Sequence, residues 1–272
     1  MRILFNKKRH LKNCSCGCVK GNVREINQDN FYFAGKHLEP NEDGLKTVIS
    51  ETIDLMEDDN QGYLFAVLDG MGGGQHGEIA SYVAAKTMSD FMPHCETSNE
   101  TANSLMLEEL CKTINARVYV AGEEIGASVM GTTMAALYFR GGRVWSCNVG
   151  DSRCYRIRKG VLEMLSEDHV EELYNVDMLI RNKKPRLIQY LGMNPEEILL
   201  EPTIKCDGIE EDDIYMICSD GLTDMVMEAD ISKIINDAAD AESATNKLID
   251  TALSNGGKDN LTVIVCRCGR RG

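Results

Sequence analysis

Short apolar runs alternate with turn-forming residues along most of the chain, and these runs predict β-strands. The runs at 31–34 and 63–68 combine aromatic and branched residues over four to six positions, as buried strands do. Further runs of this kind lie at 134–139, 143–149, 153–157, 161–165, 213–218 and 261–266. Elsewhere the apolar residues recur with helical spacing, which predicts helices over 77–92, 103–124, 228–238 and 241–254.

The connections between the four central runs are very short, at 141–142, 150–152 and 158–160. Turns of this length join antiparallel neighbours, because parallel strands need a crossover of about a dozen or more residues. We therefore expect these four runs to form one antiparallel meander, which excludes a doubly wound nucleotide-binding fold. Together with the paired helices, the pattern predicts an α+β domain with sheets inside and helices outside.

No Pro/Ser-rich linker and no abrupt change of composition divides the 272 residues, so we expect a single domain over 1–272. Residues 36–62 are acidic and rich in turn formers, which predicts an irregular surface insertion. The formal net charge of −14 opposes binding to the phosphate backbone of a nucleic acid.

The sequence also predicts the cellular environment. No apolar stretch approaches the roughly 20 residues of a membrane span. The first residues place basic side chains after a very short apolar run, the reverse of a secretory signal. The eleven cysteines are then interpreted as cytosolic thiols rather than disulfides. We expect a cytoplasmic protein that has no membrane partner.

Five aspartates stand at the edges of apolar runs, each beside a residue suited to a turn: Asp29, Asp69, Asp151, Asp220 and Asp259. Carboxylate oxygens are the ligands of hard cations such as Mg²⁺ and Mn²⁺, and one or two carboxylates per ion usually suffice. Five of them therefore suggest two or more ions that share a ligand. Paired ions assist phosphoryl transfer and make hydroxide available near neutral pH, so the pattern predicts phosphate ester hydrolysis.

Glycines and an arginine beside these aspartates fit the same chemistry. The glycine-rich stretch 70–74 permits close approach to a ligand, and the carbonyl of Gly70 can itself coordinate an ion. Arg24 offers a guanidinium that matches phosphate oxygens. Each feature alone has a plainer explanation, because Asp-Gly is foremost a turn dipeptide and a lone arginine is commonly a surface residue. Their joint occurrence favours the ligand interpretation.

With these residues in this order, the chain resembles the metal-dependent protein serine/threonine phosphatases of type 2C, particularly their compact bacterial branch. No single block would carry the resemblance, but the ordered set is specific and covers most of the chain. The blocks are GNVREINQDN (21–30), AVLDGMGG (66–73), GEIAS (77–81), GTTM (131–134), NVGDSR (148–153), EDH (167–169), CSDGLTD (218–224) and DNLTV (259–263).

The resemblance implies a central sandwich of two antiparallel β-sheets flanked by helix pairs, a four-layer α-β-β-α arrangement. It further implies a dinuclear Mn²⁺ or Mg²⁺ centre held by the carbonyl of Gly70 and by four carboxylates, those of Asp29, Asp69, Asp220 and Asp259. The water that bridges the two ions would attack phosphorus directly, without a phosphoenzyme.

Two further residues gain roles from the resemblance. Asp151 would go with a third, weaker ion that shares Asp220, and Arg24 would grip the substrate phosphate. The implied partners are phosphorylated proteins and a cognate serine/threonine kinase whose action the enzyme opposes. We expect the protein to be a monomer.

The chain departs from the family pattern at three places. Gln28 stands where many members have glutamate, which removes one charge near metal-bound water. Met71 replaces a histidine that is proposed as general acid in many eukaryotic members, so protonation of the leaving group would rely on water. The flap segment beside the active site, at about 170–190, is shorter than usual.

Two other functions stay open at this level. One is a catalytically inactive, phosphoprotein-binding regulatory domain of the same fold, and the other is a small-molecule phosphatase. All five aspartates and Arg24 are present, and an inactive copy has little physical reason to keep so many mutually repelling carboxylates together. This favours an enzyme, whereas a small-molecule phosphatase would have the same site chemistry.

The cysteines near the two ends of the chain alternate with other residues: Cys14, Cys16 and Cys18 at one end, Cys266 and Cys268 at the other. Period-2 spacing places each set on one face of a strand, and the family fold can bring the two terminal strands together. Structural zinc sites usually have two or more residues between paired cysteines. We therefore favour buried free thiols over a zinc site.

Overall fold

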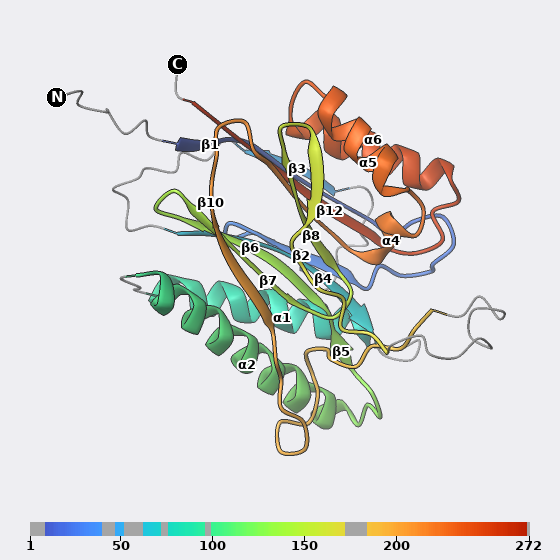
Figure 1. The fold of residues 1–272 in the computed structure, drawn as a ribbon. Helices are drawn as coiled ribbons and strands as arrows, with labels where there is room; N and C mark the ends of the chain where they lie inside the picture. The colour runs from blue at the N-terminus through green and yellow to red at the C-terminus, as the bar shows by residue number, and fades with distance from the viewer. Residues whose placement is uncertain are drawn as a thin grey trace.

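The computed structural model describes residues 9–39, 47–51, 62–71, 76–95, 99–171 and 184–270. Two antiparallel β-sheets lie face to face at its centre, and a pair of helices covers the outer face of each sheet (Figure 1). This confirms the predicted α+β class and the four-layer α-β-β-α architecture. Within the described ranges, no helix has the length and apolar character needed to cross a membrane.

Both sheets consist of antiparallel pairs throughout. The first sheet has the order β3 (Thr47–Glu51), β1 (Arg9–Val19), β12 (Leu261–Arg270), β11 (Ile214–Cys218), β8 (Arg153–Arg158) and β9 (Val161–Met164). The second sheet has the order β10 (Thr203–Gly208), β7 (Arg143–Val149), β6 (Met134–Arg140), β4 (Tyr63–Met71) and β2 (Asp29–Phe33). The two-residue strand β5 (Gly131–Thr132) pairs with the end of β4.

The predicted helices are confirmed to within a few residues. The pair α1 (Gly77–Phe91) and α2 (Glu100–Ile125) covers the second sheet, and the pair α5 (Glu228–Asp237) and α6 (Ala241–Ser254) covers the first. Asn99 caps α2 by accepting a hydrogen bond from the backbone of Ala102, and Asp240 forms a capping box with Ser243. The other helical elements of the described ranges are the single turns η1 (Met92–His94) and α4 (Asp220–Thr223).

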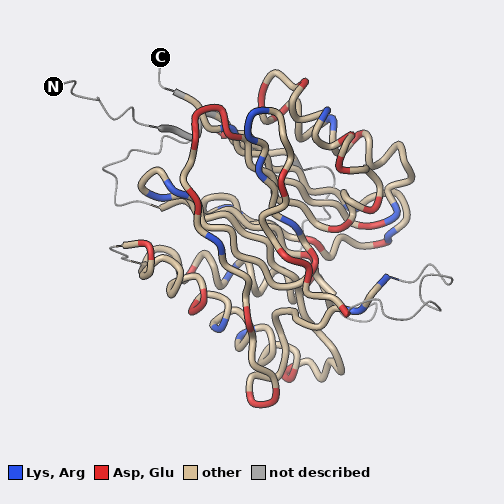
Figure 2. Tube along the Cα trace, viewed as in Figure 1, with Lys and Arg blue, Asp and Glu red and all other residues tan. Residues whose placement is uncertain are grey.

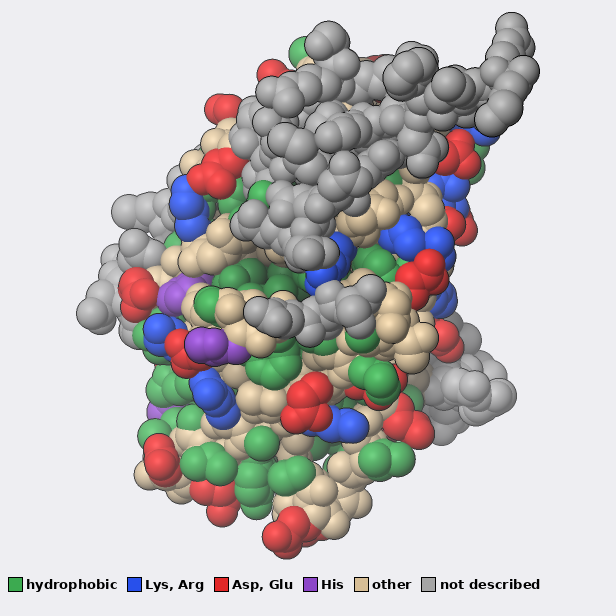
Figure 3. Space-filling model, turned by 90° about the vertical axis from the view of Figure 1, so that its left-hand side faces the viewer, with side chains coloured by type: hydrophobic (Ala, Val, Ile, Leu, Met, Phe, Trp, Pro, Cys, Tyr) green, Lys and Arg blue, Asp and Glu red, His purple; other side chains and the backbone are tan. Residues whose placement is uncertain are grey.

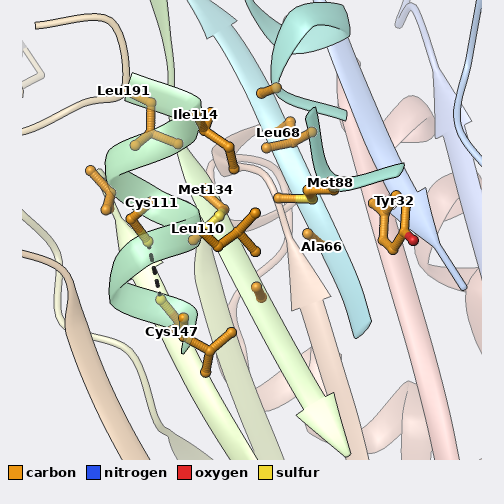
Figure 4. Close-up of a cluster of buried hydrophobic side chains, with 14 of the residues drawn as sticks. Tyr32, Ala66, Leu68, Met88, Leu110, Cys111, Ile114, Met134, Cys147 and Leu191 are labelled. Carbon is orange, nitrogen blue, oxygen red and sulfur yellow. Dashed lines mark hydrogen bonds between the residues drawn. The ribbon is translucent and has the colours of Figure 1, made fainter. Parts of the chain in front are cut away.

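The inner strands are buried on both faces, which produces three apolar layers. In β4, Leu64, Ala66 and Leu68 pack under α1 and α2, whereas Phe65 and Val67 point into the space between the sheets. Figure 4 shows the layer under α2, where Leu110 and Ile114 lie over the second sheet. There the thiols of Cys111 and Cys147 approach to 3.6 Å between their sulfur atoms.

The predicted four-strand meander is wrong at its middle. β6 pairs with β7 and β8 pairs with β9, as expected, but β7 and β8 belong to different sheets. Gly150 has a backbone φ of 100°, a conformation that favours glycine, and the turn 150–152 leads the chain from one sheet to the other. The short-turn rule fails here because this turn crosses between layers, and Asp151 consequently lies where the two sheets meet.

The prediction of an irregular insertion at 36–62 is wrong for residues 47–51, which form β3 and pair with β1. Residues 40–46 and 52–61 lie outside the described part. The strand β10, which pairs with β7 along its whole length, was not predicted from the sequence either. Both strands lie at sheet edges and are only partly buried, so their apolar pattern is weak.

The two terminal strands meet as predicted, since β1 pairs with β12 and Cys14 lies opposite Cys266. Cys16, Cys18 and Cys268 are buried with them in the layer between the sheets. Burial raises the pKa of the Cys18 thiol to about 12 and holds the pKa of Cys16 well above its usual range. These cysteines therefore act as small apolar residues of the inner core.

The layer under α2 gives a stability test on one helix. Leu110 is fully buried there, whereas Leu105 on the same helix is 57% exposed. We expect Leu110→Ala to lower the free energy of unfolding by about 2–5 kcal/mol, because it leaves a cavity. Leu105→Ala should change it by less than about 0.5 kcal/mol. Urea unfolding followed by circular dichroism measures both, and equal effects would contradict the described packing.

Candidate metal centre

The five predicted aspartates converge at one end of the sandwich. Asp29 begins β2 and Asp69 lies near the end of β4, and the two are direct partners across this strand pair. Asp220 follows β11 and Asp259 precedes β12, so the first sheet contributes at the same end. Asp151 reaches this end through the turn that crosses between the sheets. The site thus draws on both sheets.

Asp29 connects the two sheets through its carboxylate. It starts a strand of the second sheet, yet its Oδ2 accepts hydrogen bonds from Ser219 Oγ at 2.8 Å and Thr262 Oγ1 at 2.7 Å, which belong to the first sheet's side. The residue is only 3% exposed. Burial raises the pKa of Asp29 to about 7, although the two hydroxyl donors act in the opposite direction.

The backbone of Asp69 is fixed by two threonines. Its carbonyl accepts hydrogen bonds from Thr132 Oγ1 at 3.0 Å and from the Thr133 amide at 2.9 Å. Its own amide donates to Thr133 Oγ1 at 3.2 Å. The Thr133 hydroxyl also lies 2.7 Å from that of Ser152. One threonine therefore links the strand end that bears Asp69 to the turn that bears Asp151.

Burial and neighbouring carboxylates raise the pKa values of Asp29, Asp69 and Asp151. Burial holds the pKa of Asp69 well above its usual range, and the charges of the other four aspartates add to this effect. The pKa of Asp151 rises to about 6, mainly through burial and then through the charge of Asp220, while the nearby Lys184 ammonium opposes the rise. Buried carboxylates that repel one another are stabilised when they bind cations or protons.

Gly70 follows Asp69 at a position where a side chain has no room. A Cβ atom there would lie 2.1 Å from the carbonyl oxygen of Gly77 and 2.4 Å from that of Gln28. The amide of Gly70 donates to the Gln28 carbonyl at 3.1 Å. The Gln28 side chain in turn donates to Glu78 Oε2 at 3.3 Å. The negative charge next to Gln28 therefore comes from Glu78 of α1. Residues 72–74 lie outside the described part.

The loop that carries Arg24 is held by Asn260. The amide nitrogen of Asn260 donates to the carbonyls of Lys20 at 2.8 Å and Ile26 at 3.0 Å, and its Oδ1 accepts from the Gln28 amide at 2.9 Å. Arg24 itself donates to Asp259 Oδ2 at 2.6 Å and remains half exposed. The arginine predicted to bind phosphate therefore lies at the rim of the aspartate cluster.

A second cation, Lys184, approaches the cluster from the other side. Its Nζ donates to Asp220 Oδ2 at 2.5 Å and also pairs with Asp224. Lys184 lines a cavity of about 120 Å³ together with Asp151 and Asp168. Of the predicted flap segment at about 170–190, residues 172–183 lie outside the described part of the chain.

Several residues of the site were not found by sequence reasoning. Ser219 and Asn260 lie directly beside predicted ligands, and this adjacency is the only signal the sequence carries for them. The position of Thr262 in a predicted strand gives no sign of its contact with Asp29, and Lys184 is one lysine among others. Their roles depend on contacts between distant segments, which no local pattern reports.

The donor set fits divalent cations. Among the described side chains, Asp29 Oδ1 and Asp220 Oδ1 are buried oxygens without a hydrogen-bond donor, and such oxygens are costly unless a cation or donor meets them. All candidate ligands are oxygens, as Mg²⁺ and Mn²⁺ prefer. In their present conformations, no three acidic, histidine or cysteine side chains of the described ranges are placed so that they could hold an ion together. Asp259 and Asp220 instead bond to Arg24 and Lys184, so an incoming ion would compete with these two cations.

Comparisons with known proteins give a consistent result. A family model described as Protein phosphatase 2C matches residues 39–255. The serine/threonine phosphatase Stp of Listeria innocua is 31% identical over 222 residues, which cover 78% of this chain and 86% of that protein. The serine/threonine protein phosphatase PstP of Mycobacterium tuberculosis is 32% identical over 216 residues, which cover 74% of this chain and 40% of that longer protein.

The likeness extends to three dimensions. A crystal structure of the catalytic domain of PstP in complex with two manganese ions superimposes with a TM-score of 0.70 at 25% identity, covering 95% of this chain and all of that one. The family model spans Asp69, Asp151 and Asp220 but stops short of Asp29 and Asp259, whereas the structural match covers nearly the whole chain.

The raised carboxylate pKa values predict how stability depends on pH without metal. The folded-state pKa values of Asp29 (about 7) and Asp151 (about 6) lie above the usual value, so folding favours the protonated forms. This stabilising contribution is complete below about pH 4 and is lost as the pH rises through about 7. In excess EDTA, the melting temperature should therefore fall between about pH 5 and 8.

The Asp29→Asn variant provides the control, because its amide does not titrate and can still accept from Ser219 and Thr262. We expect its melting temperature to fall less steeply over the same pH range. A slope equal to that of the unchanged protein would contradict the assignment of this titration to Asp29.

Proposed function

This chain belongs to the protein phosphatase 2C family and is a protein serine/threonine phosphatase, and we propose that it hydrolyses phosphoserine and phosphothreonine at a two-metal centre. The observation that carries this mechanism is the convergence of five carboxylates, two of them with buried oxygens that lack donors, beside a half-exposed arginine. The metal-dependent part of the proposal rests on this donor set.

The four carboxylates of Asp29, Asp69, Asp220 and Asp259, together with the Gly70 carbonyl, would hold two divalent ions. Mn²⁺ and Mg²⁺ both suit such ligands, and the manganese ions in PstP favour the first. Bound ions of this kind supply a water of lowered pKa and neutralise charge on a phosphate. The carboxylate of Asp151 interacts with the charges of Asp220 and Lys184. We propose that Asp151 and Asp220 would hold a third and weaker ion.

The protein's own groups orient the substrate and the ligands. Arg24 is anchored to Asp259 and has further N–H groups that can donate to phosphate oxygens. Asp29 is oriented by Ser219 and Thr262 before any ion binds, which reduces the reorganisation needed on binding. Met71 cannot donate a proton, so we propose that the leaving alkoxide takes its proton from water.

Arg24 and Asp259 come from opposite ends of the sequence and meet at one site. We therefore propose that residues 1–272 act as one catalytic domain. Its partners would be phosphorylated proteins, and a serine/threonine kinase would perform the opposing reaction in the cytoplasm. No observation on the described residues favours the inactive binding domain over the enzyme.

The first test is metal-dependent turnover. We expect Mn²⁺-dependent hydrolysis of p-nitrophenyl phosphate and of a phosphothreonine peptide, followed by absorbance and phosphate release. Asp69→Asn and Asp220→Asn should each lower kcat at least about 100-fold, because each removes a charged ligand of the centre. Absence of metal-dependent turnover in folded unchanged protein would refute the proposal. Preference for the small ester over every phosphopeptide would favour the small-molecule phosphatase.

The second test concerns Arg24. Its replacement by alanine should raise KM about tenfold for both substrates with a smaller change in kcat, because a charge-assisted contact to the bound phosphate is lost. Arg117→Ala is the matched control, since Arg117 is equally exposed and pairs with Asp90 on the helix layer. If both variants raised KM equally, the phosphate role of Arg24 would be wrong.

A further inference from the structure

A second pocket lies between the C-terminal end of α2 and the segment 190–198. It has a volume of about 230 Å³ and is lined by residues that include Tyr119, Glu123, Val129, Tyr190, Glu197 and Ile198. We call it the side pocket. In Figure 1 the two elements that line it, the C-terminal end of α2 and the segment 190–198, lie below β5, and Figure 2 shows acidic residues at the tip of the segment and at the neighbouring end of α2.

The wall of the side pocket is fixed by buried hydrogen bonds. Asn115 of α2 donates to the Met193 carbonyl at 2.9 Å and accepts from the amides of Gly192 at 2.8 Å and Met193 at 3.0 Å. Gly192 has a φ of 115°, and a Cβ there would lie 2.5 Å from the Met130 carbonyl oxygen. The segment therefore has little freedom to collapse into the pocket.

Hydrogen bonds link the wall of the side pocket to the strand end that bears Asp69. Leu191 and Thr132 exchange two backbone hydrogen bonds of 2.9 Å, and Thr132 also donates to the carbonyl of Asp69. The ring of Tyr190 packs on Gly131, which pairs with Met71 at the end of β4. With strand spacings of about 4.8 Å, the pocket lies roughly 10–15 Å from the Gly70 carbonyl, a distance that three or four extended residues span.

The lining combines apolar surface with negative charge. Val129 is 46% exposed and Ile198 41% exposed, and two tyrosine rings flank them. Glu123 and Glu197 are exposed, and neither has an ion-pair partner within the described ranges. Partial desolvation and the charges of nearby glutamates, Glu123 and Glu197 among them, raise the pKa of the Tyr119 hydroxyl. The negative charges of Glu123 and Glu197 are thus felt inside the pocket.

Another pocket shows by contrast why this one suits a charged ligand. It has a volume of about 360 Å³, is lined by Tyr32, Tyr63, Met92 and Tyr138 among others, and lies at the opposite end of the second sheet. Figure 3 views the molecule from that end, where charges of both signs are interspersed with hydrophobic side chains. None of its lining residues in the described ranges carries a carboxylate, and it is remote from the five aspartates.

We infer that the side pocket binds a basic side chain of the substrate polypeptide, three or four residues from the phosphorylated residue. The aliphatic stem of an arginine would lie on Val129 and Ile198, and its guanidinium would face Glu123 and Glu197. The tyrosine rings add a favourable cation–π contact. This inference rests on the proposed function and names a feature of its substrates.

The test uses phosphothreonine peptides of alanine and glycine with one arginine placed at each position from four before to four after the phosphothreonine. An arginine three or four residues away on one side should raise kcat/KM about fivefold over the alanine peptide. In the double variant Glu123→Gln/Glu197→Gln this advantage should fall below about twofold. Hydrolysis of p-nitrophenyl phosphate should stay unchanged.

The double variant Glu109→Gln/Glu242→Gln is the matched control, since it removes two exposed carboxylates on α2 and α6 far from the pocket. It should keep the full arginine advantage. The inference is overturned if no arginine position is preferred by active protein, or if Glu123→Gln/Glu197→Gln keeps the preference.

Hydrolysis of p-nitrophenyl phosphate distinguishes a failure of the proposed function from a failure of the side-pocket inference. Failure to hydrolyse p-nitrophenyl phosphate would refute the proposed function, whereas turnover of the ester without any arginine preference would refute the side pocket alone. Fluorescence anisotropy of labelled arginine and alanine phosphopeptides measures binding without turnover. Tighter binding of the arginine peptide that depends on Glu123 and Glu197 supports the inference, and equal binding overturns it.

Discussion

The site depends on one buried carboxylate held between two sheets. Asp29 begins a strand of the second sheet, while the hydroxyls that hold its Oδ2 come from Ser219 and Thr262 beside the first. A buried charge is costly unless it is hydrogen-bonded or paired. The two sheets must therefore keep one relative position at this end, because any slip would separate the carboxylate from its donors. The remaining ligands are arranged around this fixed point.

Asp69 is positioned through its backbone, which leaves its carboxylate available. Thr132 of β5 and the following Thr133 hold the carbonyl of Asp69, and Asn260 holds the loop that leads into Asp29. Gly70 allows the strand end to approach the start of α1 more closely than any other residue would. The hydrogen bonds that position Asp69 thus use its backbone, whereas the carboxylates of Asp220 and Asp259 bond to Lys184 and Arg24, with which an ion would compete.

The sequence predicts the layers well because burial imposes a period of two on strands and 3.6 on helices. It also identifies the five aspartates, since each stands where a strand meets a turn. The rule that short turns join paired neighbours fails at 150–152, because a two-layer sandwich also needs a short connection between its sheets. The edge strands β3 and β10 were missed since their partial burial leaves little alternation. Lys184 and Thr262 were missed because their contacts join segments far apart in the chain.

The charge balance explains why this fold needs cations to handle a phosphate. Four ligand carboxylates in a protein of net charge −14 repel a phosphate dianion, and Arg24 alone cannot offset them. Two divalent ions would neutralise the four carboxylates. The positive charge of Arg24 at the rim would then attract the phosphate. The acidic side pocket then has a complementary role. It would attract the basic part of a phosphopeptide while the neutralised centre accepts the phosphate, so the two sites would select for opposite charges at a fixed separation.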